Sequence, residues 1–456
     1  MQPAQIGANK KNDTGMTTMV RRGLARWGSL MLVASAALMT LAAPAMAQQK
    51  KIKIGVVYDL TGPFAGGGSD LQYLGAKIII DFINKQGGVE GYMIDPVYAD
   101  AQSKPDVAIN EAVRLIEQEK VDMLLGFYAS AECVPAAARI EQFKKFMWIT
   151  TCIAAPVLKD RHLQYVFRPQ PFGTQWGLAS TEMVTAYSKQ AFGKDPKDLR
   201  VAIIHEDGAY GVDVGHGNEL GAAKGGLNVV LNEGYSSTAP DLSSLVTKLK
   251  RARPDVIFHT GYNPDISLFL RQAREGGLRF KALIGQGAGY TDYNKLKASA
   301  GTDINYFMDV DPISIFEVPS KALAPELVPI VKMVGDEYLK AKPDTVLKSA
   351  HVGMAASNTY LFMTKVLPRA IKTYGGVDAD SLRKAALDLD VPDGGTMLGF
   401  GAKFEPPEAE MAGQNLRGYP VVVQYIDDKS YVVWPKALQQ REPVLNLPDS
   451  SPYAAK

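Results

Sequence analysis

The chain has too few cysteines, too little net charge and too short an apolar run for several classes of protein. Its 456 residues include only two cysteines, too few for a disulfide-rich scaffold or a cysteine-rich zinc site. The 50 Lys and Arg residues nearly balance the 48 Asp and Glu residues, which argues against a basic face that binds nucleic acid. No apolar stretch reaches the ~20 residues of a membrane span, so we expect a mature chain that does not cross a membrane.

Catalytic and metal-binding motifs are also missing. The sequence has no Gly-x-Ser-x-Gly elbow, no His-Glu-x-x-His pair and no Walker-type phosphate loop. Its five histidines lack the spacing of metal ligands. We therefore expect a protein that is not an enzyme and that carries neither a metal nor a cofactor.

The N-terminal residues have the composition of a secretory signal peptide. Three arginines between residues 21 and 26 precede an apolar run from Leu30 to Ala43, and small residues then lead to Ala47. We expect cleavage after Ala47 and a periplasmic mature protein, with an uncleaved N-terminal anchor helix as the alternative. On this interpretation residues 1–47 are the signal peptide with an N-terminal extension.

The rest of the chain alternates short apolar runs with helical patterns, which is typical of an α/β fold with parallel sheets. Strands are expected at 52–58, 93–99, 121–125, 146–150, 201–205, 227–231, 255–259 and 282–284, with shorter strands near 399–404, 421–426 and 431–433. The pattern restarts after Arg168-Pro169, which indicates a second lobe of similar size.

Polar and aromatic residues directly after strands are the candidate ligand-binding residues, because ligands of open α/β sheets bind beyond the carboxyl ends of the strands. Ser130 opens a helix, where its hydroxyl and the free backbone N–H groups can hold a carboxylate; a plain helix cap is the alternative. Tyr210 and Tyr262 follow strands of the second lobe, where either could instead be a core residue. Cys133 and Cys152 follow neighbouring strands and could form a disulfide, remain free or act as a catalytic pair.

Several short motifs, in this order and spacing, resemble the solute-binding proteins of ABC importers, of the leucine/isoleucine/valine-binding type. They include Ile54-Gly55-Val56 before Leu60-Thr61-Gly62-Pro63, Gly87-Gly88-Val89, Phe167-Arg168, Asp207-x-x-Tyr210-Gly211 and Gly261-Tyr262-x-Pro264. The resemblance implies a type I periplasmic binding protein fold, in which two Rossmann-like lobes are joined by three hinge crossings near 168–171, 309–312 and 394–399. Residues 48–170 with 312–394 would form the first lobe and 171–311 with 395–445 the second, followed by an irregular tail at 446–456.

The resemblance also implies a ligand-binding cleft and its main contacts. Ser130, with Cys152 and Ala154, occupies the positions that grip a carboxylate, and Tyr262 occupies one that grips an ammonium group. The other ammonium position falls at 284–288, around Gly287, and contains no Asp or Glu. The residues expected to form an apolar wall are Phe64, Trp176, Tyr210, Tyr262 and Tyr290.

We therefore expect a small organic carboxylate, including aromatic ones, or an amide as the ligand. The alternative is a branched-chain or other hydrophobic α-amino acid, with Glu132, Asp207 or Asp311 as the ammonium partner. The expected partners are the membrane subunits of an ABC permease, with a signalling receptor as a minor alternative, and we expect a monomer.

Overall fold

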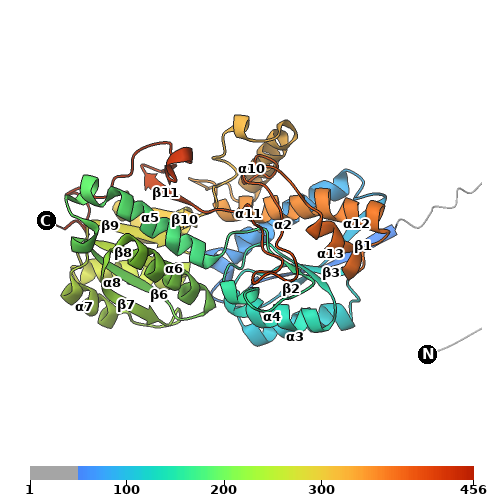
Figure 1. The fold of residues 1–456 in the computed structure, drawn as a ribbon, viewed down its shortest axis with the longest axis horizontal. Helices are drawn as coiled ribbons and strands as arrows, with labels where there is room; N and C mark the ends of the chain where they lie inside the picture. The colour runs from blue at the N-terminus through green and yellow to red at the C-terminus, as the bar shows by residue number, and fades with distance from the viewer. Residues whose placement is uncertain (1–49, 456) are drawn as a thin grey trace, which may run out of the picture. The chain divides into compact units, whose positions relative to one another are not determined.

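The computed structural model describes residues 50–455, which form two β-sheets with helices packed on them (Figure 1). The α/β class and the two-lobed architecture predicted from the sequence are confirmed. The predicted signal peptide lies outside the described residues. Within residues 50–455, no helix has the length and apolar character needed to cross a membrane.

The first sheet has five parallel strands in the order β2-β1-β3-β4-β5. These strands are β1 (Lys50–Tyr58), β2 (Tyr92–Asp100), β3 (Met123–Gly126), β4 (Phe146–Ile149) and β5 (Val166–Phe167). The helices of this lobe are α2 (Ser69–Lys85), α3 (Pro105–Glu117), α4 (Ser130–Gln142), α10 (Val328–Ala341), α11 (Ala350–Leu361), α12 (Leu367–Tyr374) and α13 (Ala379–Leu387).

Residues of β1 alternate between the two faces of this sheet, as the period of a strand requires. Ile52, Ile54 and Val56 belong to the core shared with α2 and α11. On the opposite face, a Cβ on Gly55 would lie 3.0 Å from Cδ1 of Leu115 in α3, so this position leaves no room for a larger side chain. The first sheet is thus covered by helices on both faces.

The second sheet has seven strands in the order β12-β11-β10-β9-β8-β6-β7. These strands are β6 (Arg200–Glu206), β7 (Asn228–Tyr235), β8 (Val256–Thr260), β9 (Ala282–Gln286), β10 (Met308–Asp311), β11 (Val421–Ile426) and β12 (Lys429–Trp434). The helices of this lobe are α5 (Gly173–Phe192), α6 (Ala209–Gly225), α7 (Ser243–Ala252), α8 (Asn263–Glu275) and α9 (Tyr293–Ala300). β10 pairs in parallel with β9, whereas β11 and β12 are antiparallel additions at the edge.

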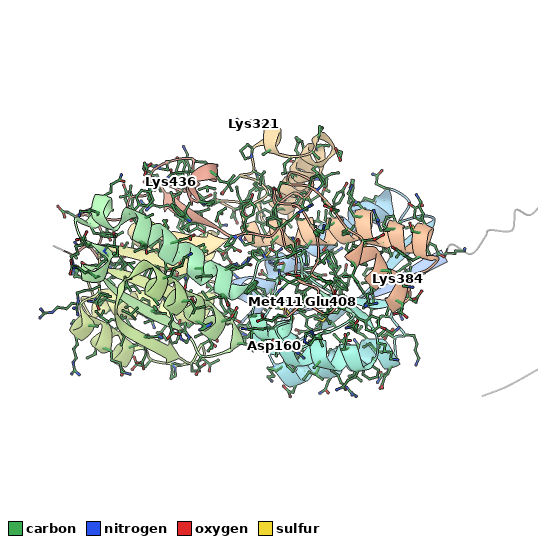
Figure 2. The ribbon with its side chains drawn as sticks, viewed as in Figure 1. Asp160, Lys321, Lys384, Glu408, Met411 and Lys436 are labelled. Atoms are coloured by element: carbon green, nitrogen blue, oxygen red, sulfur yellow. A yellow bond between two sulfur atoms is a disulfide. The ribbon has the colours of Figure 1, made fainter. Side chains whose placement is uncertain are left out.

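Residues 399–415 pack on the first lobe, which corrects their predicted place in the second. The Phe404 ring lies 5.4 Å from the rings of Trp148 and Phe167, and the N–H of Asp160 donates to the Glu410 carbonyl at 2.8 Å. Figure 2 labels Glu408 and Met411 in this segment near Asp160. The third crossing therefore lies after residue 415, because the buried aromatic ring of Phe404 anchors the preceding chain to β4 and β5.

The structure also bears on two further predictions about the C-terminal part. The strand expected near 399–404 is reduced to isolated bridges, Val391 with Ala402 and Phe404 with Asn415. The tail at 446–456 has no long regular element in its described part, as expected, but it is packed. Tyr453 is buried, and the next residue, Ala454, forms a bridge with Phe280. The Tyr453 ring stacks on Phe280 at 5.4 Å, so the tail completes the core of the second lobe.

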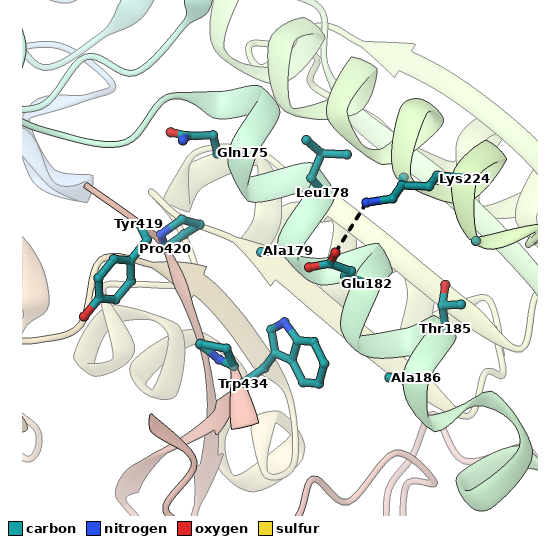
Figure 3. Close-up of a pocket in the computed structure, with 13 residues that line it drawn as sticks. Gln175, Leu178, Ala179, Glu182, Thr185, Ala186, Lys224, Tyr419, Pro420 and Trp434 are labelled. Carbon is teal, nitrogen blue, oxygen red and sulfur yellow. Dashed lines mark ion pairs between the residues drawn. The ribbon is translucent and has the colours of Figure 1, made fainter. Parts of the chain in front are cut away.

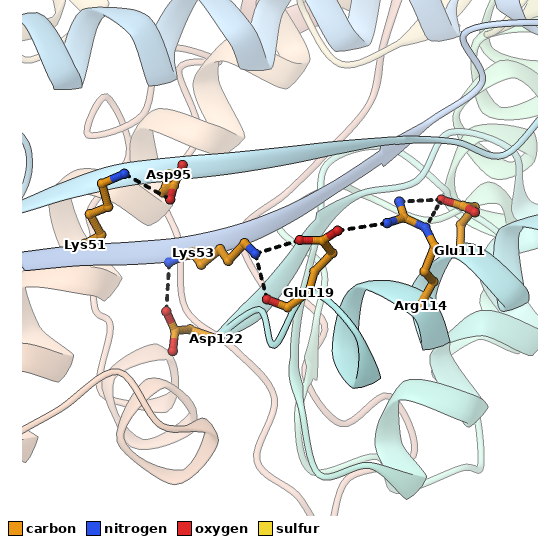
Figure 4. Close-up of polar contacts among 7 residues, drawn as sticks. All are labelled: Lys51, Lys53, Asp95, Glu111, Arg114, Glu119 and Asp122. Atoms are coloured by element: carbon orange, nitrogen blue, oxygen red, sulfur yellow. Dashed lines mark hydrogen bonds and ion pairs between the residues drawn. The ribbon is translucent and has the colours of Figure 1, made fainter.

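Several ion pairs lie at the amino-terminal edge of the first sheet (Figure 4). The Lys53 ammonium group lies 2.7 Å from the Glu119 carboxylate, and Arg114 joins Glu119 to Glu111. The Asp122 carboxylate accepts the backbone N–H of Lys53 at 2.8 Å. These groups are partly exposed, pair with one another and lie at the edge opposite the strand carboxyl ends, so they hold β1 to β3 and leave ligand binding to the other edge.

Candidate functional site

A small cavity lies between the carboxyl ends of the two sheets, where the sequence predicts a ligand-binding cleft. Its volume is about 30 Å³, and both lobes contribute to its walls. The lining residues are Tyr128, Ser130, Thr151, Cys152, Ile153, Trp176, Tyr210, Tyr262, Ala288, His351 and Met354. Most of them follow strands β3, β4, β6, β8 and β9, so the parallel strand order itself brings these loops together.

Ser130 stands at the first position of α4 and faces the loop after β4. Its Oγ accepts the backbone N–H groups of Ile153 and Ala154 at 3.2 and 3.1 Å. Because both of these contacts use the oxygen as an acceptor, the hydroxyl proton remains available for donation. The Ser130 hydroxyl and the N-terminus of α4 therefore form a site suited to an anionic group.

Four other lining residues present buried polar atoms that have no hydrogen-bond partner within residues 50–455. These atoms are Tyr128 Oη, Thr151 Oγ1, Trp176 Nε1 and His351 Nδ1. Burial and the nearby Lys295 lower the pKa of His351 to about 3, so its imidazole is neutral at physiological pH. A buried donor without a partner costs about 1–3 kcal/mol, so a ligand that supplies acceptors to these groups gains that free energy.

Aromatic rings from both lobes surround these polar atoms. The Phe64 ring of the first lobe lies 4.2 Å from the Tyr262 ring of the second. Tyr262 also packs against Tyr210 at 5.4 Å, and Trp176 meets Tyr210 edge to face at 6.5 Å. This arrangement offers flat apolar surface to the body of a ligand.

The lining contains no Asp, Glu, Lys or Arg. Glu132 is buried beside Asp59, and burial together with the charge of Asp59 raises the pKa of Glu132 to about 10. Asp311 shares the Thr291 hydroxyl with Asp309, at 2.6 and 2.7 Å. Asp207 is exposed to solvent, so none of the three predicted ammonium partners lines the cavity.

The predicted site residues fall into three groups. Ser130, Cys152, Trp176, Tyr210 and Tyr262 line the cavity. Phe64, Ala154 and Gly287 do not line the cavity but contact residues that do. The Phe64 ring packs against the Tyr262 ring, the Ala154 N–H donates to the Ser130 hydroxyl, and Gly287 lies against the Trp176 ring.

Tyr290 is placed elsewhere, so its prediction as a wall residue is wrong. It is fully buried in the second-lobe core, where its hydroxyl lies 2.7 Å from Nδ1 of His259. Its ring packs over Gly285, where a Cβ would overlap the ring, and Tyr425 donates to its carbonyl at 3.1 Å. These contacts hold Tyr290 in the core of the second lobe, and it is not among the residues that line the cavity.

The structure joins Cys133 and Cys152 in a disulfide, with their Cα atoms 6.4 Å apart. Cys133 lies one turn after Ser130 in α4, and Cys152 lies in the loop that Ser130 holds. The disulfide therefore fixes the loop to the helix at the end of the cavity where Ser130 lies.

Two charged residues that sequence reasoning did not select as site residues also hold this loop. The Arg168 guanidinium is fully buried and donates to the carbonyls of Ala154 and Cys152 at 2.7 and 3.3 Å, and burial lowers its pKa to about 9. The Asp213 carboxylate of α6 accepts the N–H of Ala155 at 3.0 Å across the cleft. The Phe167-Arg168 motif was a signal for Arg168, whereas no local pattern marks Asp213.

A much larger groove of about 690 Å³ lies on the second lobe (Figure 3). Its walls come from α5, α6 and the segment around Tyr419 and Trp434. Its charged groups, Glu182 and Lys224, form an exposed pair at 3.6 Å, and no unpartnered buried polar atom lines it. The smaller cavity, whose lining residues include buried polar atoms without partners, is the better candidate site. Residues 50–455 contain no group of three or more His, Cys, Asp or Glu side chains arranged to hold a metal.

Comparisons with known proteins agree with this geometry. Residues 51–419 match the family model described as periplasmic binding protein. The Leu/Ile/Val-binding protein homolog 7 of Brucella suis biovar 1 (strain 1330) is 34% identical over 408 residues, covering 90% of this chain and 96% of that protein. The branched-chain amino acid transporter substrate-binding protein LivJ from Streptococcus pneumoniae, in complex with isoleucine, has a TM-score of 0.66 and 18% identity, covering 85% of this chain and 100% of that chain. A fatty acid ABC transporter substrate-binding protein from Thermomonospora curvata has a TM-score of 0.67 and 19% identity, covering 87% of this chain and 95% of that chain.

Proposed function

This chain belongs to the periplasmic binding protein family, and on that premise we propose that it captures a small organic carboxylate, or the matching amide, with an apolar body. The ligand occupies the cleft between the lobes, outside the cytoplasm, and the loaded protein delivers it to the membrane subunits of an ABC permease. The observation that carries this proposal is a cavity lined by buried donors and by no carboxylate. The function is binding rather than catalysis.

The polar lining supports a carboxylate or amide head group. The Ser130 hydroxyl is free to donate, and the hydroxyl of Thr151, which lines the same cavity, has no partner within residues 50–455. Hydrogen bonds to an ionised acceptor contribute about 1.5–3 kcal/mol each, so two such donors can hold a carboxylate without Lys or Arg. The rings of Phe64, Tyr210 and Tyr262 then cover the apolar body.

The small size of the cavity supports capture by closure of the lobes. About 30 Å³ is far below the ~300–1,000 Å³ of typical ligand sites, so ligand entry requires the lobes to separate. The contacts of Phe64 with Tyr262 and of Asp213 with Ala155 join the lobes in this closed arrangement. A ligand that adds further contacts between the lobes favours the closed state.

A hydrophobic α-amino acid is the second candidate ligand, because the Brucella relative is named as a Leu/Ile/Val-binding homologue and LivJ is described with isoleucine. An ammonium group buried without a partner costs several kcal/mol. Because no Asp or Glu lines the cavity, the carboxylate without an α-ammonium group fits the lining better.

The proposal can be tested with a ligand panel and one isosteric variant. Protein that has been unfolded and refolded to remove carried ligand is titrated with aliphatic and aromatic carboxylates, amides and branched-chain amino acids, and binding is read by calorimetry and thermal shift. Thr151→Val removes an unpartnered hydroxyl, so it is expected to weaken carboxylate binding about tenfold while leaving the melting temperature unchanged or higher. Thr247→Val, on the exposed surface of α7, is the matched control.

Two results would contradict the proposal. If only the branched-chain amino acids of the panel bind, the ligand is the second candidate, a hydrophobic α-amino acid. Carboxylate binding that is equal in the wild type and in Thr151→Val would remove Thr151 from the head-group site, and the same result with Ser130→Ala would place the carboxylate elsewhere.

A further inference from the structure

Trp176 reaches the cavity from the fourth position of α5 and lies over the loop that follows β9. It is 3% exposed, and a Cβ on Gly287 would overlap its ring atom Cζ3. Gly287 has φ +67°, a left-handed conformation that glycine adopts without strain. The missing side chain at Gly287 thus creates the space that the indole ring fills.

The indole nitrogen of Trp176 is a donor that no group within residues 50–455 accepts. An indole N–H can only donate, unlike a hydroxyl or a neutral imidazole. It lines the same cavity as Ser130 and Thr151, which belong to the opposite lobe. Trp176 therefore offers a hydrogen to the ligand from the second lobe, and a ligand ammonium group placed against its N–H would meet another donor.

Ser130 and Thr151 line the cavity from the first lobe, and Trp176 lines it from the second. A ligand whose carboxylate binds Ser130 and Thr151 needs a second acceptor if it is also to pair with Trp176. An oxygen on the carbon next to the carboxylate is the acceptor nearest to such a head group.

We propose that the cleft selects 2-oxo or 2-hydroxy acids with an apolar body, because the Trp176 N–H pairs with the oxygen on the carbon next to the carboxylate. This inference rests on the proposed function and makes it more specific. The oxo oxygen is the better acceptor for a donor-only group, and a 2-hydroxy group can also accept the indole hydrogen. An acid with no 2-substituent leaves the Trp176 N–H buried and unpaired, and a 2-ammonium group opposes it.

The test compares ligands that share a carbon skeleton and differ only at the second carbon. On the branched skeleton these are 4-methyl-2-oxopentanoate, 2-hydroxy-4-methylpentanoate, 4-methylpentanoate and leucine; on the aromatic skeleton they are phenylpyruvate, phenyllactate, 3-phenylpropanoate and phenylalanine. We expect the oxo or hydroxy acid of one skeleton to bind at least tenfold tighter than the unsubstituted acid. Trp176→Phe should reduce that ratio to about threefold or less, because an unpaired buried donor costs about 1–3 kcal/mol and a factor of ten corresponds to 1.4 kcal/mol.

Trp434→Phe is the matched control, since Trp434 lines the groove of Figure 3 and not the small cavity, so its replacement should leave the ratio unchanged. A second readout avoids dependence on the folding of the Trp176 variant. In protein labelled with ¹⁵N-tryptophan, the Nε1–H resonance of Trp176 should shift with the oxo acid and move much less with the unsubstituted acid.

The outcomes separate this inference from the proposed function. If the unsubstituted acid binds as tightly as the oxo and hydroxy acids, the inference is wrong and the carboxylate function stands. If leucine or phenylalanine binds tightest, both are wrong. If none of the eight compounds binds, both are also contradicted for apolar bodies of this size.

Discussion

Asp59 and Glu132 form a buried pair of carboxyl groups behind the site. Asp59 follows β1 and accepts the N–H of Ser103 at 2.7 Å, and Glu132 lies in the first turn of α4. Burial raises the pKa of both groups, and the pKa of Glu132 rises to about 10. At neutral pH the folded protein therefore keeps a proton on this pair, whereas the unfolded chain releases it.

The sign of the resulting pH dependence follows from these values. Between the ordinary carboxyl pKa and about 10, the folded state binds more protons than the unfolded state, so the free energy of unfolding falls as pH rises through this range. Glu132→Gln mimics the protonated acid. It should raise the free energy of unfolding at pH 8 by at least ~1 kcal/mol and change it little at pH 4.

Urea unfolding from pH 4 to pH 9 measures this effect. Glu408→Gln changes an exposed carboxylate and serves as the control. Equal pH slopes in the wild type and in Glu132→Gln would show that Glu132 ionises in the folded protein as freely as in the unfolded chain.

Helix α4 and the loop after β4 act as one unit because the Cys133–Cys152 disulfide and the Ser130 hydroxyl both join them. Replacing both cysteines with alanine should lower the free energy of unfolding by about 2–4 kcal/mol, mainly because the unfolded chain without the cross-link has a higher conformational entropy. The affinity for the ligand should fall severalfold, because the loop carrying Thr151 becomes less restrained.

Urea unfolding and calorimetric titration of the double variant provide these numbers, and thiol titration of the denatured wild type checks the bond itself. Two free thiols in the wild type, together with unchanged stability in the variant, would contradict the disulfide and its role.

The strands predicted from one short apolar run each agree best with the structure. The strands around Ile54, Leu124 and Trp148 and most of those of the second sheet occur close to their predicted places, because buried parallel strands have short, continuous apolar runs. The short strands β5 and β10 were not predicted. The strand expected at 399–404 failed for a reason beyond its own sequence. Phe404 buries its ring against Trp148 and Phe167, and the segment forms only isolated bridges instead of pairing within a sheet.

The Asp213 carboxylate accepts hydrogen bonds from both sides of the cleft. Asp213 Oδ2 accepts the N–H of Ala155 from the first lobe and the N–H of Thr174 from the start of α5, both at 3.0 Å. Asp213→Asn should weaken ligand binding about tenfold or more, because a hydrogen bond to a charged group contributes about 1.5–3 kcal/mol.

Small-angle scattering and calorimetry together test this role in closure. We expect ligand to reduce the radius of gyration of the wild type and the variant to need more ligand for the same reduction. Asp207→Asn, an exposed acid on the same lobe, should behave like the wild type. A protein that does not become more compact with ligand would contradict closure as the capture mechanism.

The sequence alone determined the α/β class, the approximate places of most strands and the position of Ser130, Tyr210 and Tyr262 after strand ends. Local periodicity fixes such features, and parallel pairing gathers these ends at one edge of a sheet. The sequence also showed that residues 284–288 contain no Asp or Glu.

Only the tertiary structure decided which side chains face the cleft. Tyr290 turns into the core toward His259, whereas Trp176, more than a hundred residues before Gly287, fills the space beside that glycine. The segment 399–415 joins the first lobe, and Asp213 reaches across to Ala155. The direction of a side chain depends on the atoms packed around it, and those atoms come from distant parts of the chain that no local pattern brings together.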